Sequence, residues 1–122
     1  MSGAPWRLTS VLPMPDEAVL AALGDLADRT KLTLLPSSSV PELHAALSDA
    51  ELVLGAWQSA GAARIDAEAV AATGPDLVFF QQPSAGVDVL DVPALTARGV
   101  PVANAAGANA RSVAEWAVAA TL

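Results

Sequence analysis

The feature that most constrains the fold of this chain is a repeated alternation between short apolar runs and segments of helical periodicity. The apolar runs predict strands near residues 8–12, 32–35, 51–55, 77–80 and 100–103. The periodic segments predict helices near 16–27, 41–47, 65–72, 91–97 and 111–122, and proline or glycine bounds most of these elements. Strands that alternate with helices are typical of a doubly wound parallel sheet in the α/β class. Right-handed crossovers favour a flavodoxin-like five-stranded sheet with the order 2-1-3-4-5.

Composition agrees with one folded domain. The chain has 122 residues, of which 53% are hydrophobic and 16% are charged. This charged fraction is below the usual value of about 25% and excludes intrinsic disorder. The continuous apolar run from Leu77 to Phe80 is typical of a central parallel strand that is covered on both faces.

Charge and residue usage exclude several classes of function. Thirteen acidic and six basic residues give a net charge of −7, and the basic residues are scattered, so neither nucleic acid nor a membrane is an expected partner. The absence of cysteine excludes disulfides, thiolate metal sites and thiol catalysis. The single histidine, His44, falls on a predicted peripheral helix and is interpreted as an ordinary helix residue. No secretory signal or run of about 20 apolar residues is present, so a cytoplasmic location is expected.

Familiar phosphate-binding and catalytic motifs are also missing. No two glycines are separated by a single residue, which excludes G-x-G-x-x-G, and the P-loop pattern is absent. A G-x-S-x-G elbow is absent as well. The response-regulator pattern fails, because Pro13, Gly55 and Asn104 stand where its acidic residues and lysine would be. In a sheet of this type, ligands bind outside the carboxyl ends of the strands. The candidate sites are therefore the loops that follow the five predicted strands, after Leu12, Leu35, Gly55, Phe80 and Ala103.

Three stretches in the second half of the chain resemble one known family. They are Ser84-Ala85-Gly86-Val87-Asp88 with Asp91, Arg98-Gly99-Val100-Pro101-Val102 with Asn104, and Asn109-Ala110-Arg111-Ser112-Val113-Ala114-Glu115. In this order and at this spacing they resemble the D-isomer-specific 2-hydroxyacid dehydrogenases. Residues 1–76 fit that family only in the number and length of their predicted elements.

The resemblance implies a domain organisation and an activity. Residues 1–110 are expected to form a substrate domain, and residues 111–122 to begin the interdomain helix. The resemblance assigns the NAD(P)-binding domain, the substrate arginine and the catalytic histidine and acid to a part of the enzyme that is absent from this chain. We therefore expect no catalytic residue and no bound cofactor in this chain alone. The complete protein would use NAD or NADP to interconvert 2-oxo and D-2-hydroxy acids, and a homodimer is expected.

The resemblance also implies a binding site. In the family, main-chain N–H groups of the loop matching Ser84, Ala85 and Gly86 hold the substrate carboxylate. The residue types agree, since glycine permits close approach and adjacent N–H groups can bind an anion; the alternative is that Gly86 only makes a turn. Trp57 either lines the substrate pocket or serves in packing. Asn109 either hydrogen-bonds the substrate or, as we favour, caps the last helix.

The remaining polar residues of these stretches are interpreted structurally. Ser112 and Glu115 form the S-x-x-E pattern and are predicted to cap the last helix. Asp88 and Asp91 are predicted to serve in a turn and at a helix start. The last helix carries apolar residues on all sides, so we expect it to be buried in a larger assembly and the isolated chain to self-associate.

Two other classes of function stay open. One is a non-catalytic binding or interaction module of the same fold, because fold alone does not fix function. The downstream sequence would distinguish this module from an enzyme by the presence or absence of the catalytic residues. The other is a flavodoxin-like small-molecule binder, which a flavin titration would reveal.

Overall fold

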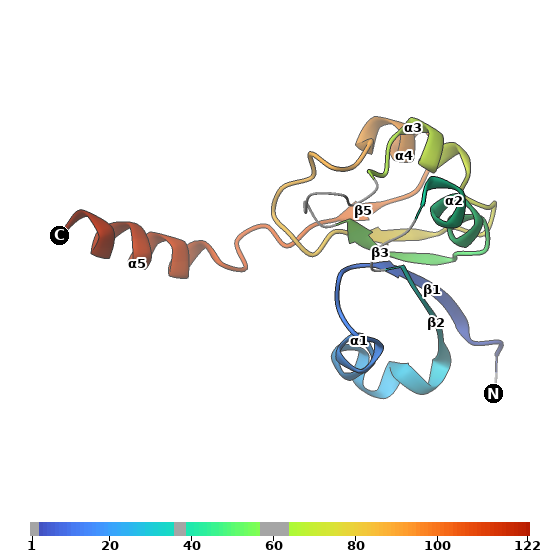
Figure 1. Cartoon of the computed structure of the whole chain (residues 1–122), viewed down its shortest axis with the longest axis horizontal. Helices are drawn as coiled ribbons and strands as arrows, with labels where there is room; N and C mark the ends of the chain where they lie inside the picture. Colours follow the sequence, from blue (N-terminus) through green and yellow to red (C-terminus); the bar gives the residue numbers. More distant parts are fainter. Residues whose placement is uncertain (1–2, 36–38, 57–63) are drawn as a thin grey trace.

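The computed structural model describes residues 3–35, 39–56 and 64–122, and it contains one parallel five-stranded sheet (Figure 1). The strand order is β2-β1-β3-β4-β5, which confirms the predicted α/β class and topology. The strands are β1 (Trp6–Val11), β2 (Thr30–Leu34), β3 (Leu52–Ala56), β4 (Phe79–Gln81) and β5 (Val102–Ala103). Each lies within three residues of its predicted position.

Five α-helices connect or follow the strands. They are α1 (Asp16–Leu23), α2 (Val40–Ser48), α3 (Ala67–Ala71), α4 (Val92–Ala97) and α5 (Ala110–Thr121). The prediction of a single helix over residues 16–27 is wrong in its second half. Gly24 takes a positive φ of 55°, which ends α1, and a 3-10 helix, η1 (Gly24–Arg29), follows.

The helices divide unequally between the two faces of the sheet. Figure 1 shows α2, α3 and α4 together over one face, and α1 with η1 over the other face near β1 and β2. The main hydrophobic core lies beneath the three-helix layer. Its largest fully buried apolar side chains come from the strands and from the covering segments: Val53, Phe80, Leu43, Leu47, Ile65, Val70 and Leu95.

The opposite face carries one apolar row that crosses four strands. Parallel register aligns Leu32, Leu8, Leu52 and Phe79 in this row. Leu8 is buried, whereas the other three side chains are half-buried. This face is therefore less completely covered than the three-helix face.

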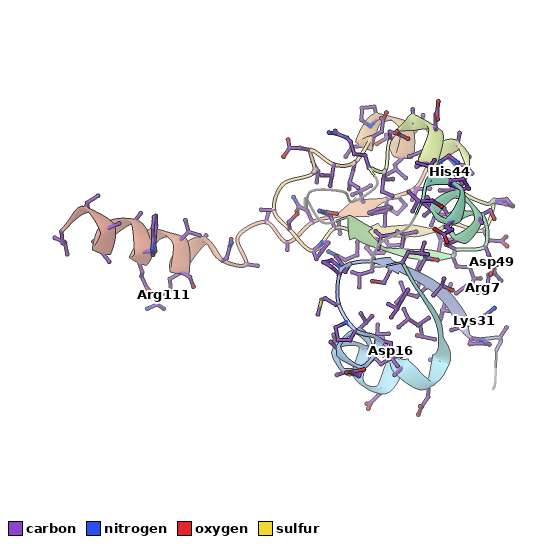
Figure 2. The ribbon with its side chains drawn as sticks, viewed as in Figure 1. Arg7, Asp16, Lys31, His44, Asp49 and Arg111 are labelled. Atoms are coloured by element: carbon purple, nitrogen blue, oxygen red, sulfur yellow. The ribbon has the colours of Figure 1, made fainter. Side chains whose placement is uncertain are left out.

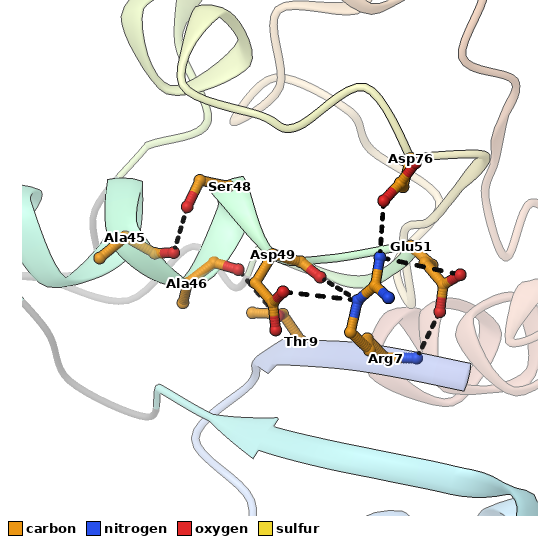
Figure 3. Close-up of polar contacts among 8 residues, drawn as sticks. All are labelled: Arg7, Thr9, Ala45, Ala46, Ser48, Asp49, Glu51 and Asp76. Atoms are coloured by element: carbon orange, nitrogen blue, oxygen red, sulfur yellow. Dashed lines mark hydrogen bonds and ion pairs between the residues drawn. The ribbon is translucent and has the colours of Figure 1, made fainter. Parts of the chain in front are cut away.

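Arg7 joins three segments at the amino-terminal edge of the sheet (Figure 3). Its Nε donates to the carbonyl oxygen of Asp49 at 2.7 Å, and its Nη2 donates to Oδ2 of Asp76 at 2.9 Å. Its backbone N–H donates to Oε2 of Glu51 at 2.9 Å. These bonds connect β1 to the turn before β3 and to the segment before β4, at the edge opposite to the candidate loops.

Helix starts partly follow the predicted pattern. Asp91 caps α4 by accepting from the N–H of Ala94 at 2.9 Å, as predicted. The prediction that Ser112 and Glu115 cap the last helix is wrong, because α5 begins at Ala110 and Glu115 accepts from Nε of Arg111 at 2.8 Å. A pair at this (i, i+4) spacing belongs to the interior of a helix.

A capping box that the sequence interpretation missed stands at α2. The Ser39 hydroxyl accepts from the N–H of Glu42, and a Glu42 carboxylate oxygen accepts from the N–H of Ser39 at 2.8 Å. The Ser39 N–H bond and, secondly, the Ser39 hydroxyl bond lower the pKa of the Glu42 carboxyl.

Helix α5 extends away from the rest of the domain (Figure 1). All of its residues are exposed, including Val113, Trp116 and Val118, with Trp116 72% exposed. In the part of the chain that the structure describes, every helix is too short or too polar to cross a bilayer.

Candidate functional site

The candidate site is the loop after β4, at the carboxyl edge of the sheet. Gly55 in β3 allows this loop to lie close to the sheet. A Cβ atom at Gly55 would overlap Cδ of Pro83, and it would lie 2.5 Å from Oε1 of Gln82 and 2.8 Å from the carbonyl oxygen of Gln81. The missing side chain of Gly55 therefore sets the path by which the chain leaves β4.

Every carbonyl group of the predicted carboxylate-binding residues is occupied by a donor from the protein. The carbonyl oxygen of Ser84 accepts from the N–H of Ala105 at 3.0 Å, and that of Ala85 accepts from Nδ2 of Asn104 at 2.9 Å. The carbonyl oxygen of Gly86 accepts from the Ser84 hydroxyl at 2.9 Å. The acceptors of the loop are thus satisfied by the domain itself.

The N–H groups of the same residues have no acceptor in the part of the chain that the structure describes. Within residues 3–35, 39–56 and 64–122, no group accepts a hydrogen bond from the N–H of Ser84, Ala85 or Gly86. Ala85 and Gly86 are exposed and Ser84 is half-buried. Consecutive main-chain donors without acceptors can bind an anion, and a carboxylate supplies two acceptor oxygens.

Gly86 lies beside the carboxylate of Asp88 in this loop. Its φ lies outside the left-handed region, so its backbone conformation does not require glycine. A Cβ atom at Gly86 would have one neighbour within 4 Å among the described residues, namely Oδ2 of Asp88 at 3.1 Å. Glycine at this position therefore avoids a close contact with the Asp88 carboxylate.

Two residues that the sequence interpretation did not assign hold the loop in place. The buried Gln82 donates from its backbone N–H to the carbonyl oxygen of Ala103 at 2.7 Å, and from Nε2 to the Ser84 hydroxyl at 2.7 Å. Asn104 holds Ala85 as described above. Polar residues directly after apolar strands were the available signal, but their partners depend on the tertiary fold.

The other predicted site residues are not brought to the loop. Asn109 takes the N-cap position of α5, where its carbonyl oxygen accepts from the N–H of Val113 at 3.0 Å. Its exposed side chain makes no hydrogen bond with a described residue. Trp57 lies outside the described residues. Arg64, which was not predicted, donates from Nη2 to the carbonyl oxygen of Asp88 at 2.7 Å and places a positive charge beside the loop.

The groups gathered at this loop are suited to binding a ligand through hydrogen bonds. His44 lies on α2 and is half-buried (Figure 2). Among the residues that the structure describes, no three His, Cys, Asp or Glu side chains are grouped so that they could hold a metal ion. The loop itself offers main-chain donors, with the guanidinium of Arg64 nearby.

Comparisons with known proteins agree with this fold. The model of a family described as "D-isomer specific 2-hydroxyacid dehydrogenase, catalytic domain" matches residues 9–121. D-3-Phosphoglycerate dehydrogenase of Mycobacterium leprae is 40% identical over 111 residues, which cover 84% of this chain and 18% of that protein. The chain spans about a fifth of the length of such curated relatives.

Solved structures show the same fold at lower identity. The holo form of Rhodotorula graminis D-mandelate dehydrogenase has a TM-score of 0.75 at 22% identity and covers 94% of this chain and 35% of its own. Entamoeba histolytica 3-phosphoglycerate dehydrogenase with bound NAD+ has a TM-score of 0.72 at 20% identity and covers 95% of this chain and 38% of its own.

Proposed function

The chain belongs to the D-isomer specific 2-hydroxyacid dehydrogenases, and from this premise we propose that it is the substrate-binding portion of an oxidoreductase that interconverts 2-oxo and D-2-hydroxy acids. In this proposal residues 1–110 form the substrate domain. Residues 111–122 begin a helix that leads towards a cofactor domain.

The observation that carries the proposal is the loop of Ser84, Ala85 and Gly86. Its three carbonyl groups are occupied by the protein, and its three N–H groups are free of described acceptors. The carboxylate of an acid substrate needs hydrogen-bond donors, and main-chain N–H groups supply them with little reorganisation. Arg64 adds a positive charge near the same loop.

NAD or NADP is the proposed cofactor of the whole protein. Hydride transfer is the chemistry that such a cofactor supplies when it is bound. These 122 residues do not fit it, because they contain no glycine-rich turn of the kind that holds a pyrophosphate at a helix N-terminus. We therefore assign the cofactor, and the groups that move the proton, to a part of the protein outside these residues.

The exposed helix α5 supports a larger assembly. Val113, Trp116 and Val118 are each more than half exposed and lie on more than one side of the helix, so α5 presents an apolar surface to solvent. We propose that this surface contacts the remainder of the complete protein and that the complete protein is a homodimer. A cytoplasmic location stays a prediction of the sequence.

Titration of the carboxylate site tests the proposal. Amide resonances of the 15N-labelled chain are followed by NMR while pyruvate or glyoxylate is added. The N–H signals of Ser84, Ala85 and Gly86 should shift together, with a dissociation constant in the millimolar range or weaker, about −4 kcal/mol. Acetone, which has no carboxylate, should leave these signals unchanged.

Two variants at one exposed position sharpen the test. Ala85→Pro removes a single N–H donor and should abolish the shifts, whereas Ala85→Ser keeps the donor and should retain them. If no 2-oxo acid shifts these signals in the wild-type chain, the carboxylate site is refuted. If the full-length natural protein, supplied with NAD or NADP, neither oxidises 2-hydroxy acids nor reduces 2-oxo acids, the enzymatic assignment is refuted.

A further inference from the structure

We propose that Gln82 is a positioning residue that orders the carboxylate loop through the hydroxyl group of Ser84. The inference rests on the proposed function of this loop. Gln82 does not touch the substrate in this scheme. It acts through a two-step chain of hydrogen bonds that ends at the carbonyl group of Gly86.

The first step is a bond between a buried amide and a hydroxyl group. Gln82 is only 1% exposed, and its Nε2 donates to Oγ of Ser84 at 2.7 Å. A buried amide that lost its partner would keep the cost of desolvation, so this bond is maintained strongly in the folded state. The position of Gln82 is fixed further by its backbone N–H, which donates to the carbonyl oxygen of Ala103 at 2.7 Å.

The second step follows from the chemistry of a hydroxyl group. A serine hydroxyl has one proton to donate, together with lone pairs that accept. Because Gln82 donates to Ser84, the Ser84 proton is directed away from Gln82, and it is donated to the carbonyl oxygen of Gly86 at 2.9 Å. Two bonds in sequence polarise each other, so the second is strengthened by the first.

The consequence concerns the free N–H groups. The bond to Gly86 closes the loop on itself across Ala85, whose own carbonyl group is held by Nδ2 of Asn104 at 2.9 Å. With the carbonyl groups fixed, the N–H groups are ordered before the substrate arrives. A preordered site does not lose that conformational entropy on binding, and this raises its affinity.

Gly55 makes this placement of Gln82 possible. A Cβ atom at Gly55 would lie 2.5 Å from Oε1 of Gln82, closer than real contacts allow. The amide therefore occupies space that only glycine leaves open. Sequence patterns could not show this, because Gly55 lies in β3 and Gln82 follows β4, and the two meet only in the folded domain.

The test uses isosteric and matched variants of the whole chain. Gln82→Met keeps the volume and removes the donor. Gln81→Met is the control, because Gln81 is the adjacent residue of the same type and its Nε2 donates to the carbonyl oxygen of Gln82 at 3.0 Å, not to Ser84. Ser84→Ala removes the hydroxyl group from a half-buried position that should tolerate the change, and Ser84→Thr restores it.

Two readouts are measured by NMR. In the ligand-free chain, the carbonyl 13C shift of Gly86 reports its hydrogen bond, and 15N relaxation reports the order of Ser84 to Gly86. With pyruvate as the probe, the dissociation constant is measured from the same amides. Gln82→Met and Ser84→Ala should each lose the Gly86 signature and weaken binding about three- to tenfold. Gln81→Met should resemble the wild type in both readouts, and Ser84→Thr should retain the Gly86 signature.

A double-variant cycle separates the relay from general destabilisation. If Gln82 acts through Ser84, the Gln82→Met, Ser84→Ala double variant should bind about as weakly as either single variant. Additive losses would overturn the inference. So would an unchanged Gly86 signal in Gln82→Met, even if pyruvate binds well. Failure of the wild-type chain to bind pyruvate would instead overturn the proposed function, while the ligand-free signals would still decide whether the relay exists.

Discussion

Replacing Gly55 with alanine should disturb the site and the stability of the domain together. The added Cβ atom would meet three heavy atoms closer than 3.0 Å, one of which is the backbone carbonyl oxygen of Gln81. The side chain of Gln82 can rotate, but only by giving up its bond to Ser84. The ring of Pro83 and the backbone of Gln81 can move only if the exit of β4 shifts.

The magnitude follows from two opposing effects. Forcing an extra carbon atom into a packed region costs about 1–3 kcal/mol. Alanine also restricts the unfolded chain, which returns about 0.4–1 kcal/mol where the native conformation is allowed. The φ of Gly55 lies outside the left-handed region, so this gain applies. We therefore expect Gly55→Ala to lower the free energy of unfolding by about 1–2 kcal/mol.

Urea unfolding followed by circular dichroism measures this difference, and Gly86→Ala is the matched control. At Gly86 the only described neighbour of the new Cβ atom is the flexible carboxylate of Asp88 at 3.1 Å, so Gly86→Ala should change the free energy of unfolding by less than about 0.5 kcal/mol. Gly55→Ala should also shift the amide signals of residues 82–86. A Gly55→Ala domain with wild-type stability and unchanged loop signals would refute the close packing described above.

Three further predictions concern other parts of the chain. Arg7→Met should lower the free energy of unfolding by about 1 kcal/mol in low salt and by less in high salt. The reason is that the carboxylate partners of Arg7 are partly exposed, so dissolved ions screen their attraction to the guanidinium. Urea unfolding at two salt concentrations measures this difference. Glu42→Gln should be less stable than the wild type at neutral pH. Because the pKa of Glu42 is lowered in the fold, this difference should disappear as the pH falls through that lowered pKa, and a wild-type advantage that persists at low pH would contradict the capping box. The chain should self-associate in sedimentation experiments through α5, and Trp116→Ser should weaken this association.

Much of the fold was predictable because its signals are local. Alternating apolar and periodic segments identified five strands, and the handedness of crossovers then gave the order 2-1-3-4-5. Errors arose where two local signals compete. The S-x-x-E pattern occurs at Ser39, Ser48 and Ser112, but only the pattern at Ser39 contains a proline, Pro41, which suits the first turn of a helix. At Ser112 the pattern falls inside α5, where Arg111 takes the Glu115 carboxylate.

The candidate site was predictable only in part. The stretch at Ser84, Ala85 and Gly86 came from a family resemblance, whereas the pairing of its carbonyl groups comes from residues up to 21 positions away, such as Ala105. Gln82 gives no local signal of burial, because a glutamine after a strand is usually exposed. Its role depends on the missing side chain of Gly55 in a neighbouring strand. The fit of the Gln82 side chain into the space beside Gly55 cannot be read from the sequence of either segment alone.

Strand β5 has only two residues, so the segment that holds the carboxylate loop lies close to the start of α5. Three consecutive residues, Ala103, Asn104 and Ala105, hold the carboxylate loop, and five residues later the chain enters α5. A helix of 12 residues is about 18 Å long, so a small rotation of the chain after these three residues becomes a larger displacement at the far end of α5. A swing of α5 that pulls Ala105 away from Ser84 loosens the loop. By thermodynamic linkage, a carboxylate bound in the loop then disfavours this movement of α5 by the same free energy.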